Sequence, residues 1–382
     1  MHKPLGAGII GAGVIFRNHA AAYNSLKGRV RLVGLSDLDE FKINRSGPEY
    51  FIPYTTTDYH ELIAREDIDL VSICTPPTIH EQMVKDCLDA GKYVICEKPL
   101  AATLAASDRI LEYAEKYPGK LSTVFQMRYA NNARRTIWSR DNGLLGDLAF
   151  GRFQRQGILL PAQIAKGWWG RWEDGGGAVM TQSIHELDLI LHFFGPVTRV
   201  KASIATMGHS IESEDTFGAT MEHENGAVTT CSCTLAGNVS FYAGWSVIGT
   251  EAAIQQSGAL HCGDKWKRLQ SMRRLNKAFP VQKQKTLLPG VAGKVANKVI
   301  SRIRPRKRKT TSNHTPYVAE VLDAINENNP LPVGPEEARR AVELCTAIHT
   351  SAIKDEAVSL PLDRSAAFYD GVTTNDYDGR SR

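Results

Sequence analysis

The sequence AGIIGAG at residues 7–13 decides the fold of the first part of the chain. Its apolar half predicts a buried strand, and a helix is expected from about residue 14 to 26. Gly11 and Gly13 lie at the junction, where glycine lets the backbone turn tightly and approach a pyrophosphate at the helix N-terminus. Phe16 occupies the position of the third glycine in the common G-x-G-x-x-G pattern, so this stretch alone also fits a structural turn.

An acidic residue at the end of the next strand favours dinucleotide binding. Residues 30–35 predict that strand, and Asp37 follows it, 24 residues after Gly13. A carboxylate there can accept hydrogen bonds from the adenosine ribose hydroxyls and repel a 2′-phosphate. We therefore expect NAD(H) in preference to NADP(H), although Lys42 and Arg45 lie close enough in sequence to weaken the preference.

The alternation of short apolar runs with helical patterns continues to about residue 127. It then gives way to longer β-rich runs, which fit an antiparallel sheet with one covered face. We expect an α/β fold: a Rossmann parallel-sheet domain at 1–127, an α+β domain with a large, mostly antiparallel open sheet at 128–362, and a polar, poorly packed tail at 363–382. Further strands are expected at 70–74, 93–96, 121–125, 148–158, 197–207, 216–223, 226–236 and 239–250, and further helices near 78–91, 99–117, 131–143, 182–194, 315–328 and 335–354.

Composition and cysteine usage limit the class of protein. The chain has 382 residues, 42% hydrophobic and 23% charged, which is ordinary for a soluble two-domain protein. The amino terminus does not resemble a secretory signal peptide, and seven scattered cysteines indicate a reducing compartment, so a cytoplasmic location is expected. Cys231 and Cys233 share one face of a predicted strand, but no second pair stands at zinc-site spacing, and we expect no metal.

Two motifs follow predicted strands of the parallel sheet, where such sheets bind ligands. They are TPPTIH at 75–80 and CEKPL at 96–100. With these motifs the chain resembles the glucose-fructose oxidoreductase and inositol dehydrogenase (Gfo/Idh/MocA) family. The resemblance continues through QMRY at 126–129, LLGD at 144–147, Trp172 followed by GGG at 175–177, HELD at 185–188, the helix at 317–325, EARRA at 337–341 and LPL at 360–362.

The resemblance implies a Rossmann domain that binds NAD, and hydride transfer to or from a secondary alcohol or ketone of a sugar, polyol, sugar acid or nucleotide sugar. It also implies that Lys98 and His185 flank the reacting hydroxyl as the catalytic pair. The expected cofactor-binding residues are Gly11, Gly13, Val14, Ile15, Asp37, Thr75, Pro76, Pro77, His80, Glu97, Lys98 and Gln126. The expected substrate-binding residues are Lys98, Arg128, Tyr129, Trp172, Thr181, His185 and Asp188.

The chemistry of these side chains agrees with that assignment. Oxidation of a secondary alcohol requires a group that takes or shares the hydroxyl proton. A partly desolvated Lys98 near NAD⁺ has its charged form disfavoured, and His185 titrates near neutral pH without much adjustment. Asp188, one helical turn after His185, could orient the ring or bind a substrate hydroxyl.

Three details remain open. Many relatives carry Asp where this chain has Thr181, so a Lys-Asp-His relay is not available and the proton path is uncertain. Arg128 and Tyr129 are candidates for binding sugar hydroxyls. Trp172 either stacks on a sugar or packs a loop together with Trp168 and Trp169.

Two other functions compete with the dehydrogenase. One is a glycosidase that retains NAD⁺ and cleaves by transient oxidation and elimination, which is known among relatives. The other is a non-catalytic dinucleotide-binding sensor, because a yeast galactose-pathway repressor resembles this fold. The presence of both Lys98 and His185 argues against the sensor.

Charge is concentrated in one segment, residues 265–309, which hold sixteen Lys or Arg and no Asp or Glu. Without those sixteen charges the net charge of +5 becomes −11, and a nucleic-acid-binding surface is not expected. The segment predicts two amphipathic stretches, 266–279 and 291–303, separated by LLPG at 287–290. We favour an oligomer arm or surface cap over a membrane-surface helix pair or an electropositive lid.

The predicted sheet also bears on assembly. Residues 228–231 offer apolar positions on both faces, so we expect the open face to be buried in a homo-oligomer, a dimer or tetramer, as family members usually are.

Overall fold

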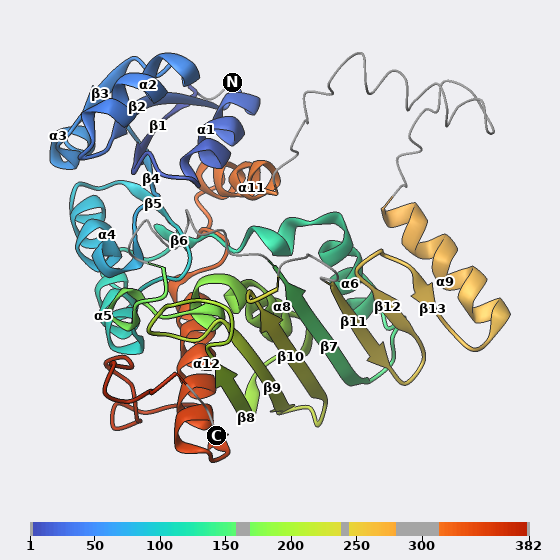
Figure 1. The fold of residues 1–382 in the computed structure, drawn as a ribbon. Helices are drawn as coiled ribbons and strands as arrows, with labels where there is room; N and C mark the ends of the chain where they lie inside the picture. Colours follow the sequence, from blue (N-terminus) through green and yellow to red (C-terminus); the bar gives the residue numbers. More distant parts are fainter. Residues whose placement is uncertain (1–2, 158–168, 238–243, 280–312, 380–382) are drawn as a thin grey trace, which may run out of the picture.

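The computed structural model describes residues 3–157, 169–237, 244–279 and 313–379. They form two sheets with helices around them, and Figure 1 shows the smaller sheet and its helices above and to one side of the larger one. In this part of the chain no helix is long and apolar enough to cross a membrane.

The amino-terminal domain is the predicted parallel sheet of the Rossmann type. Its six strands lie in the order β3-β2-β1-β4-β5-β6, and each neighbouring pair is parallel. Neighbouring crossovers leave β1 in opposite directions, so the ligand crevice of such a sheet is expected at the carboxyl ends of β1 and β4. The strands are β1 Leu5–Ile10, β2 Val30–Ser36, β3 Tyr54–Thr56, β4 Leu70–Ile73, β5 Tyr93–Cys96 and β6 Leu121–Thr123. The helices are α1 Phe16–Ser25, α2 Glu40–Tyr50, α3 Tyr59–Ile63, α4 His80–Asp89 and α5 Leu104–Ala114.

The second sheet has eight strands in the order β13-β12-β11-β7-β10-β9-β8-β14. It is mostly antiparallel, as expected, but β7 and β10 run parallel to each other. Side chains alternate between buried and exposed along β9 and β8, so one face is covered and the other faces solvent. The strands are β7 Leu148–Gln156, β8 Val197–Ala205, β9 Thr216–His223, β10 Val228–Thr234, β11 Gly244–Gly249, β12 Ala253–Gln255, β13 Leu260–His261 and β14 Val358–Ser359.

Helices of the second part cover the inner face and reach the Rossmann domain. α8 (Ile184–Phe194) packs on β7 and β10, and α6 (Asn131–Asp141) packs on α8. α12 (Pro335–Lys354) packs on β8 and on α5 of the Rossmann domain, and α11 (His314–Asn326) packs on α1. Arg339 of α12 donates to Asp108 of α5 at 2.6 Å, which adds a charged contact between the two parts. Figure 1 shows α11 and α12 on the side of the large sheet nearest the Rossmann domain.

The carboxyl-terminal segment is anchored at a few positions. Most of residues 363–379 are exposed or partly exposed, as expected of a polar tail, but Val372 and Tyr377 are buried. Tyr369 adds two contacts: its carbonyl accepts from the Ala105 N–H at 3.0 Å, and its hydroxyl donates to Asp108 at 2.5 Å. Tyr377 is buried, with its ring 5.6 Å from that of Trp172.

The first amphipathic stretch of the basic segment is a helix, α9 (Lys265–Ala278). Leu275 is buried, but Trp266 is 75% exposed, so the apolar stripe is only partly covered. The second stretch and the intervening 287–290 lie outside the described residues, and the predicted cap, arm or lid is not tested.

Candidate active site

The glycine turn adopts the expected geometry. Gly11 has a φ of +99°, and a Cβ there would lie 2.6 Å from the Cys74 carbonyl oxygen, so only glycine fits. A Cβ on Gly13 would meet nothing within 4 Å, which leaves room for a ligand to approach the backbone. Val14 is 81% exposed, and Ile15, the N-cap of α1, makes no side-chain capping bond, so the first amides of α1 are available to an anion. Phe16 is buried against Tyr50, which accounts for the absence of the third glycine.

Asp37 lies beside this turn. One carboxylate oxygen accepts from the Ala12 N–H at 2.7 Å and the other from the Asp39 N–H at 2.9 Å, while the Lys42 ammonium is 3.4 Å away. Two large apolar side chains nearby were not predicted: Leu38 is 90% and Phe41 76% exposed. Apolar groups this exposed at the carboxyl end of β2 are suited to cover a flat ring such as adenine.

His80 has a different position from the one expected of a cofactor contact. It is completely buried, and its Nε2 lies 2.9 Å from the Thr75 carbonyl oxygen. Its Nδ1 lies 3.1 Å from the carbonyl oxygen of Pro99 and 3.2 Å from that of Leu100. His80 therefore ties the TPP loop to the EKP loop. Thr75 and Pro76 are partly exposed, and Pro77 is buried.

Glu97 lies in a buried polar network under the EKP loop. It accepts from the Lys98 N–H at 3.2 Å and lies 2.9 Å from His19 Nε2. His19 in turn lies 3.0 Å from the Ser72 hydroxyl. With His314, 3.5 Å away, these groups bring three potential metal ligands within 4.8 Å of one another, a juxtaposition that the sequence did not reveal. The contacts of Glu97 assign the cluster to holding the EKP loop against α1 and α11.

Lys98 reaches from the Rossmann domain into the second domain. Its ammonium donates to the carbonyl oxygen of Thr181 at 2.7 Å. Thr181 belongs to a π-helical segment, Val179–Ser183, and its hydroxyl donates to the Gly177 carbonyl. Burial lowers the pKa of Lys98, and the nearby Arg155 guanidinium also lowers it, while Glu97 and Glu186 act in the opposite direction. An amine with a lowered pKa is suited to accept a proton.

His185 follows the π-helical segment as the second residue of α8. It is buried, and its Nδ1 makes no hydrogen bond to any described residue. Burial and the charge of Lys98 hold the pKa of His185 well below its usual value, so the ring is neutral. The Gln126 side-chain oxygen, also buried, likewise has no protein partner among the described residues. Orphaned buried polar atoms next to a strand end indicate a place for a ligand.

Asp188 and Arg128 bind each other rather than standing free. Asp188 is fully buried and accepts from Arg128 Nε and Nη2 at 2.6 to 3.1 Å. Arg128 Nη1 donates to Glu337 at 2.5 Å. These contacts indicate a structural role for the pair, and no hydrogen bond joins Asp188 to His185 among the described residues. The predicted contacts of Arg128 and Asp188 with the substrate stay predictions.

Tyr129 and Trp172 are both packed in the interior. The Tyr129 hydroxyl donates to Glu320 at 3.3 Å and its ring contacts Tyr317 of α11. Trp172 is 5% exposed, with its ring 5.2 Å from His349. Of the two interpretations of Trp172, the packing of a loop agrees with this position.

One pair of charged residues near Lys98 was not predicted. Arg155 of β7 donates from Nε and Nη2 to the two carboxylate oxygens of Glu186, at 3.0 and 2.9 Å. Glu186 is adjacent to His185 in α8. Its only sequence indication was its place inside the HELD motif.

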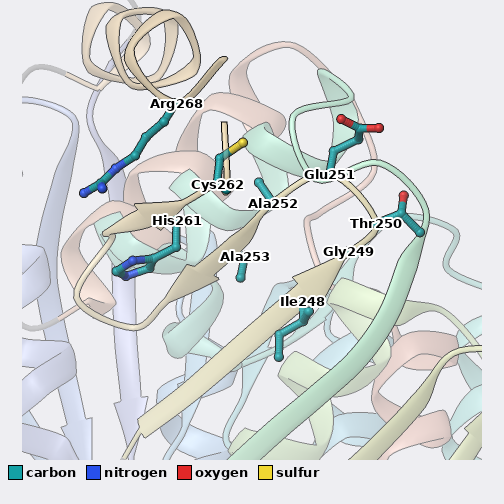
Figure 2. Close-up of a pocket in the computed structure, with 10 residues that line it drawn as sticks. Ile248, Gly249, Thr250, Glu251, Ala252, Ala253, His261, Cys262 and Arg268 are labelled. Atoms are coloured by element: carbon teal, nitrogen blue, oxygen red, sulfur yellow. The ribbon is translucent and has the colours of Figure 1, made fainter. Parts of the chain in front are cut away.

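Figure 2 shows a separate cavity of about 290 Å³ beside β11, β12, β13 and α9. None of the predicted site residues lines it. His261, Cys262 and Arg268 are among the residues around it.

Comparisons with known proteins agree with the geometry. A family model described as "Oxidoreductase family, NAD-binding Rossmann fold" matches residues 5–125, and one described as "GFO/IDH/MocA C-terminal domain" matches residues 131–255. Two similar curated proteins are the uncharacterized oxidoreductase YrbE of Bacillus subtilis, 28% identical over 60% of this chain, and D-apiose dehydrogenase of Paraburkholderia graminis, 27% identical over 60%. The matches span 66% and 60% of those relatives' own lengths.

A solved structure shares the fold over nearly the whole chain. It is the WlbA dehydrogenase of Bordetella pertussis in complex with NADH and UDP-GlcNAcA. The TM-score is 0.79 at 20% identity, and the match covers 94% of this chain and 99% of that one.

Proposed function

Because the chain belongs to the GFO/IDH/MocA family of NAD-binding oxidoreductases, we propose that it transfers hydride between NAD(H) and a secondary alcohol or ketone of a carbohydrate. The substrate class comprises sugars, polyols, sugar acids and nucleotide sugars. D-apiose dehydrogenase and the WlbA complex are named for ligands of this kind, which supports the choice.

The position of Lys98 carries the proposal. Its amine crosses from the Rossmann domain to the π-helical segment that precedes His185. The two proposed proton-transfer groups, Lys98 of the Rossmann domain and His185 of the second domain, therefore lie at the junction of the two domains. Burial lowers the pKa of both side chains, which favours the neutral amine and the neutral imidazole. Perturbed titratable groups that converge in this way are typical of active sites.

The cofactor site fits NAD. The open space above Gly13 and the free amides at the start of α1 suit a pyrophosphate, and Asp37 suits a ribose with two free hydroxyls. Leu38 and Phe41 are suited to cover the adenine. When bound, NAD⁺ supplies the hydride acceptor of the reaction.

In the proposed reaction Lys98 takes the hydroxyl proton. Its amine keeps one N–H on the Thr181 carbonyl, and this bond holds the nitrogen in place while the lone pair accepts the proton. Neutral His185 hydrogen-bonds to the same hydroxyl and holds it in line with Lys98. In the reverse direction Lys98 returns the proton to the carbonyl oxygen as the alcohol forms.

Purified protein incubated with NAD⁺ and a panel of polyols, aldoses, uronates and anhydrosugars tests the proposal. NADH should appear in proportion to the alcohol oxidised. Glycoside cleavage without net NADH would instead establish the glycosidase, and NAD binding without turnover of any substrate would favour the sensor.

Two variants test the roles of the catalytic pair. Lys98→Met and His185→Ala should each lower kcat by about a hundredfold or more, the usual effect of removing a positioned proton-transfer group, while NAD(H) affinity largely survives. Wild-type turnover in both variants would contradict the mechanism.

A further inference from the structure

The inference concerns Arg155, which lies near the end of β7. Along this strand Gly151 and Phe153 are buried on the inner face of the sheet, and Arg152 is exposed on the other. Arg155 follows the same alternation to the inner face, opposite Cys233 of β10. An arginine on the covered face of a sheet needs a specific reason, because burial of its charge is costly.

The contacts of Arg155 account for only part of its hydrogen-bonding capacity. Nε and Nη2 bind the two oxygens of Glu186 side-on. Nη2 also lies 3.9 Å from the sulfur of Met127, the residue that follows Gln126 in the sequence. Within the described part of the chain Nη1 donates to no acceptor, and 26% of the side chain is exposed. The outer edge of the guanidinium, formed by Nη1 and Nη2, is therefore available to a ligand, and this edge matches a carboxylate in geometry.

The residues that contact Arg155 are adjacent in sequence to predicted site residues. Glu186 is adjacent to His185 in α8, and Met127 lies between Gln126 and Arg128. The carboxylate of Glu186 occupies Nε and one side of Nη2, so it leaves the outer edge of the Arg155 guanidinium without an anionic partner. The nicotinamide ring of bound NAD⁺ would add a positive charge on the same side. An anionic substrate would complement this arrangement better than a neutral one.

We propose that the outer edge of Arg155 binds a carboxylate, and that the substrate is a sugar acid, either free or linked to a nucleotide. This inference rests on the proposed function and narrows its substrate class. Glu186 acts as the positioning residue that fixes the guanidinium side-on and turns its free edge towards the ligand.

The test compares sugars that differ only in the charged group. Glucuronate against glucose and galacturonate against galactose form the free arm, and UDP-glucuronate against UDP-glucose forms the nucleotide arm. In at least one arm the acid should have a kcat/KM at least about thirtyfold above its neutral partner, on the scale of a charge-assisted bidentate bond. The arm with the larger value identifies the source of the carboxylate.

Variants of the strand assign the effect to Arg155. In R155Q the KM for the acid should rise at least tenfold, and the ratio of kcat/KM for the acid to that for its neutral partner should fall by at least tenfold. R152Q alters the same residue type on the opposite face of β7 and should leave both substrates unaffected. R155Q combined with E186Q removes the pair together, so no buried carboxylate is left unpaired if R155Q alone folds poorly.

The outcomes separate the two proposals. Acids and neutral sugars turned over equally well, or an R155Q loss that is the same for both, would overturn the carboxylate site and leave the dehydrogenase intact. No NADH from any substrate would instead count against the dehydrogenase itself.

Discussion

Replacement of Asp188 by alanine tests whether this residue supports the fold or the substrate. Its side chain is 1% exposed and that of Arg128 9%, and three N···O distances of 2.6, 2.9 and 3.1 Å join them. Without Asp188 the guanidinium stays buried and retains only Glu337, whose side chain is 46% exposed. Breaking a buried pair from one side costs about 3–5 kcal/mol, and we expect a loss of that size in the free energy of unfolding.

Urea denaturation followed by fluorescence measures the loss. The matched control is Glu222→Ala, which breaks the Arg199–Glu222 pair of β8 and β9 at 3.0 Å. These partners are 55% and 54% exposed, so the control should cost less than about 1 kcal/mol. The double variant Arg128→Met with Asp188→Leu removes both charges and should be more stable than Asp188→Ala alone.

The two roles of Asp188 give opposite results. If the free energy of unfolding of Asp188→Ala lies within about 1 kcal/mol of the wild-type value and the KM for the substrate rises steeply, Asp188 binds a substrate hydroxyl and the structural reasoning is wrong. A large loss of stability in Asp188→Ala that the double variant recovers would establish the ion pair as a structural element.

Three further predictions follow from the structure. Gly13→Ala should weaken NAD(H) binding at least tenfold in calorimetry yet change the free energy of unfolding by less than about 1 kcal/mol, because its Cβ meets no protein atom. The control Gly177→Ala, whose Cβ would lie 1.8 Å from the Glu214 carbonyl oxygen, should lower the free energy of unfolding by at least about 2 kcal/mol. The pKa of His185 is held below its unfolded value near 6.5, so the folded state binds fewer protons, and the contribution of His185 to stability is lost as the pH falls below 6.5, by up to about 1.4 kcal/mol per pH unit. In urea titrations between pH 7.5 and 5, the free energy of unfolding should therefore fall less steeply with pH in His185→Gln than in the wild type. Deletion of 265–309 should change the oligomer size by light scattering and leave NAD(H) affinity intact, while vesicle binding lost on deletion would favour the membrane interpretation.

The sequence predicted the elements of this fold well because their periodicity is local. The alternation of β9 and β10 and the glycine turn at 11–13 each depend on neighbouring residues, and the structure has strands and a turn there. The anchors of the tail, Tyr369 and Tyr377, were not predicted because their partners Asp108 and Trp172 lie far away in sequence.

Motifs in the sequence marked the candidate site residues, but the contacts these residues make in the structure could not be predicted. Lys98 and His185 are marked by motifs, whereas the Arg128–Asp188 and Arg155–Glu186 pairs join residues 60 and 31 positions apart. Such pairs depend on which strand lies under α8 and on the register of β7 against β10. No local pattern encodes either feature, so neither ion pair could be predicted from the sequence.

The contact between Lys98 and Thr181 explains how the chain tolerates its departure from the common Asp. The acceptor is the backbone carbonyl of Thr181, so the position of the ammonium does not depend on the side chain at 181. The Thr181 hydroxyl is occupied by the Gly177 carbonyl within the same turn, and it holds the π-helical segment in shape. Lys98 thus keeps its anchor across the two domains while losing a carboxylate neighbour. A carboxylate there would stabilise the charged amine, so threonine at 181 favours the neutral form that accepts a proton.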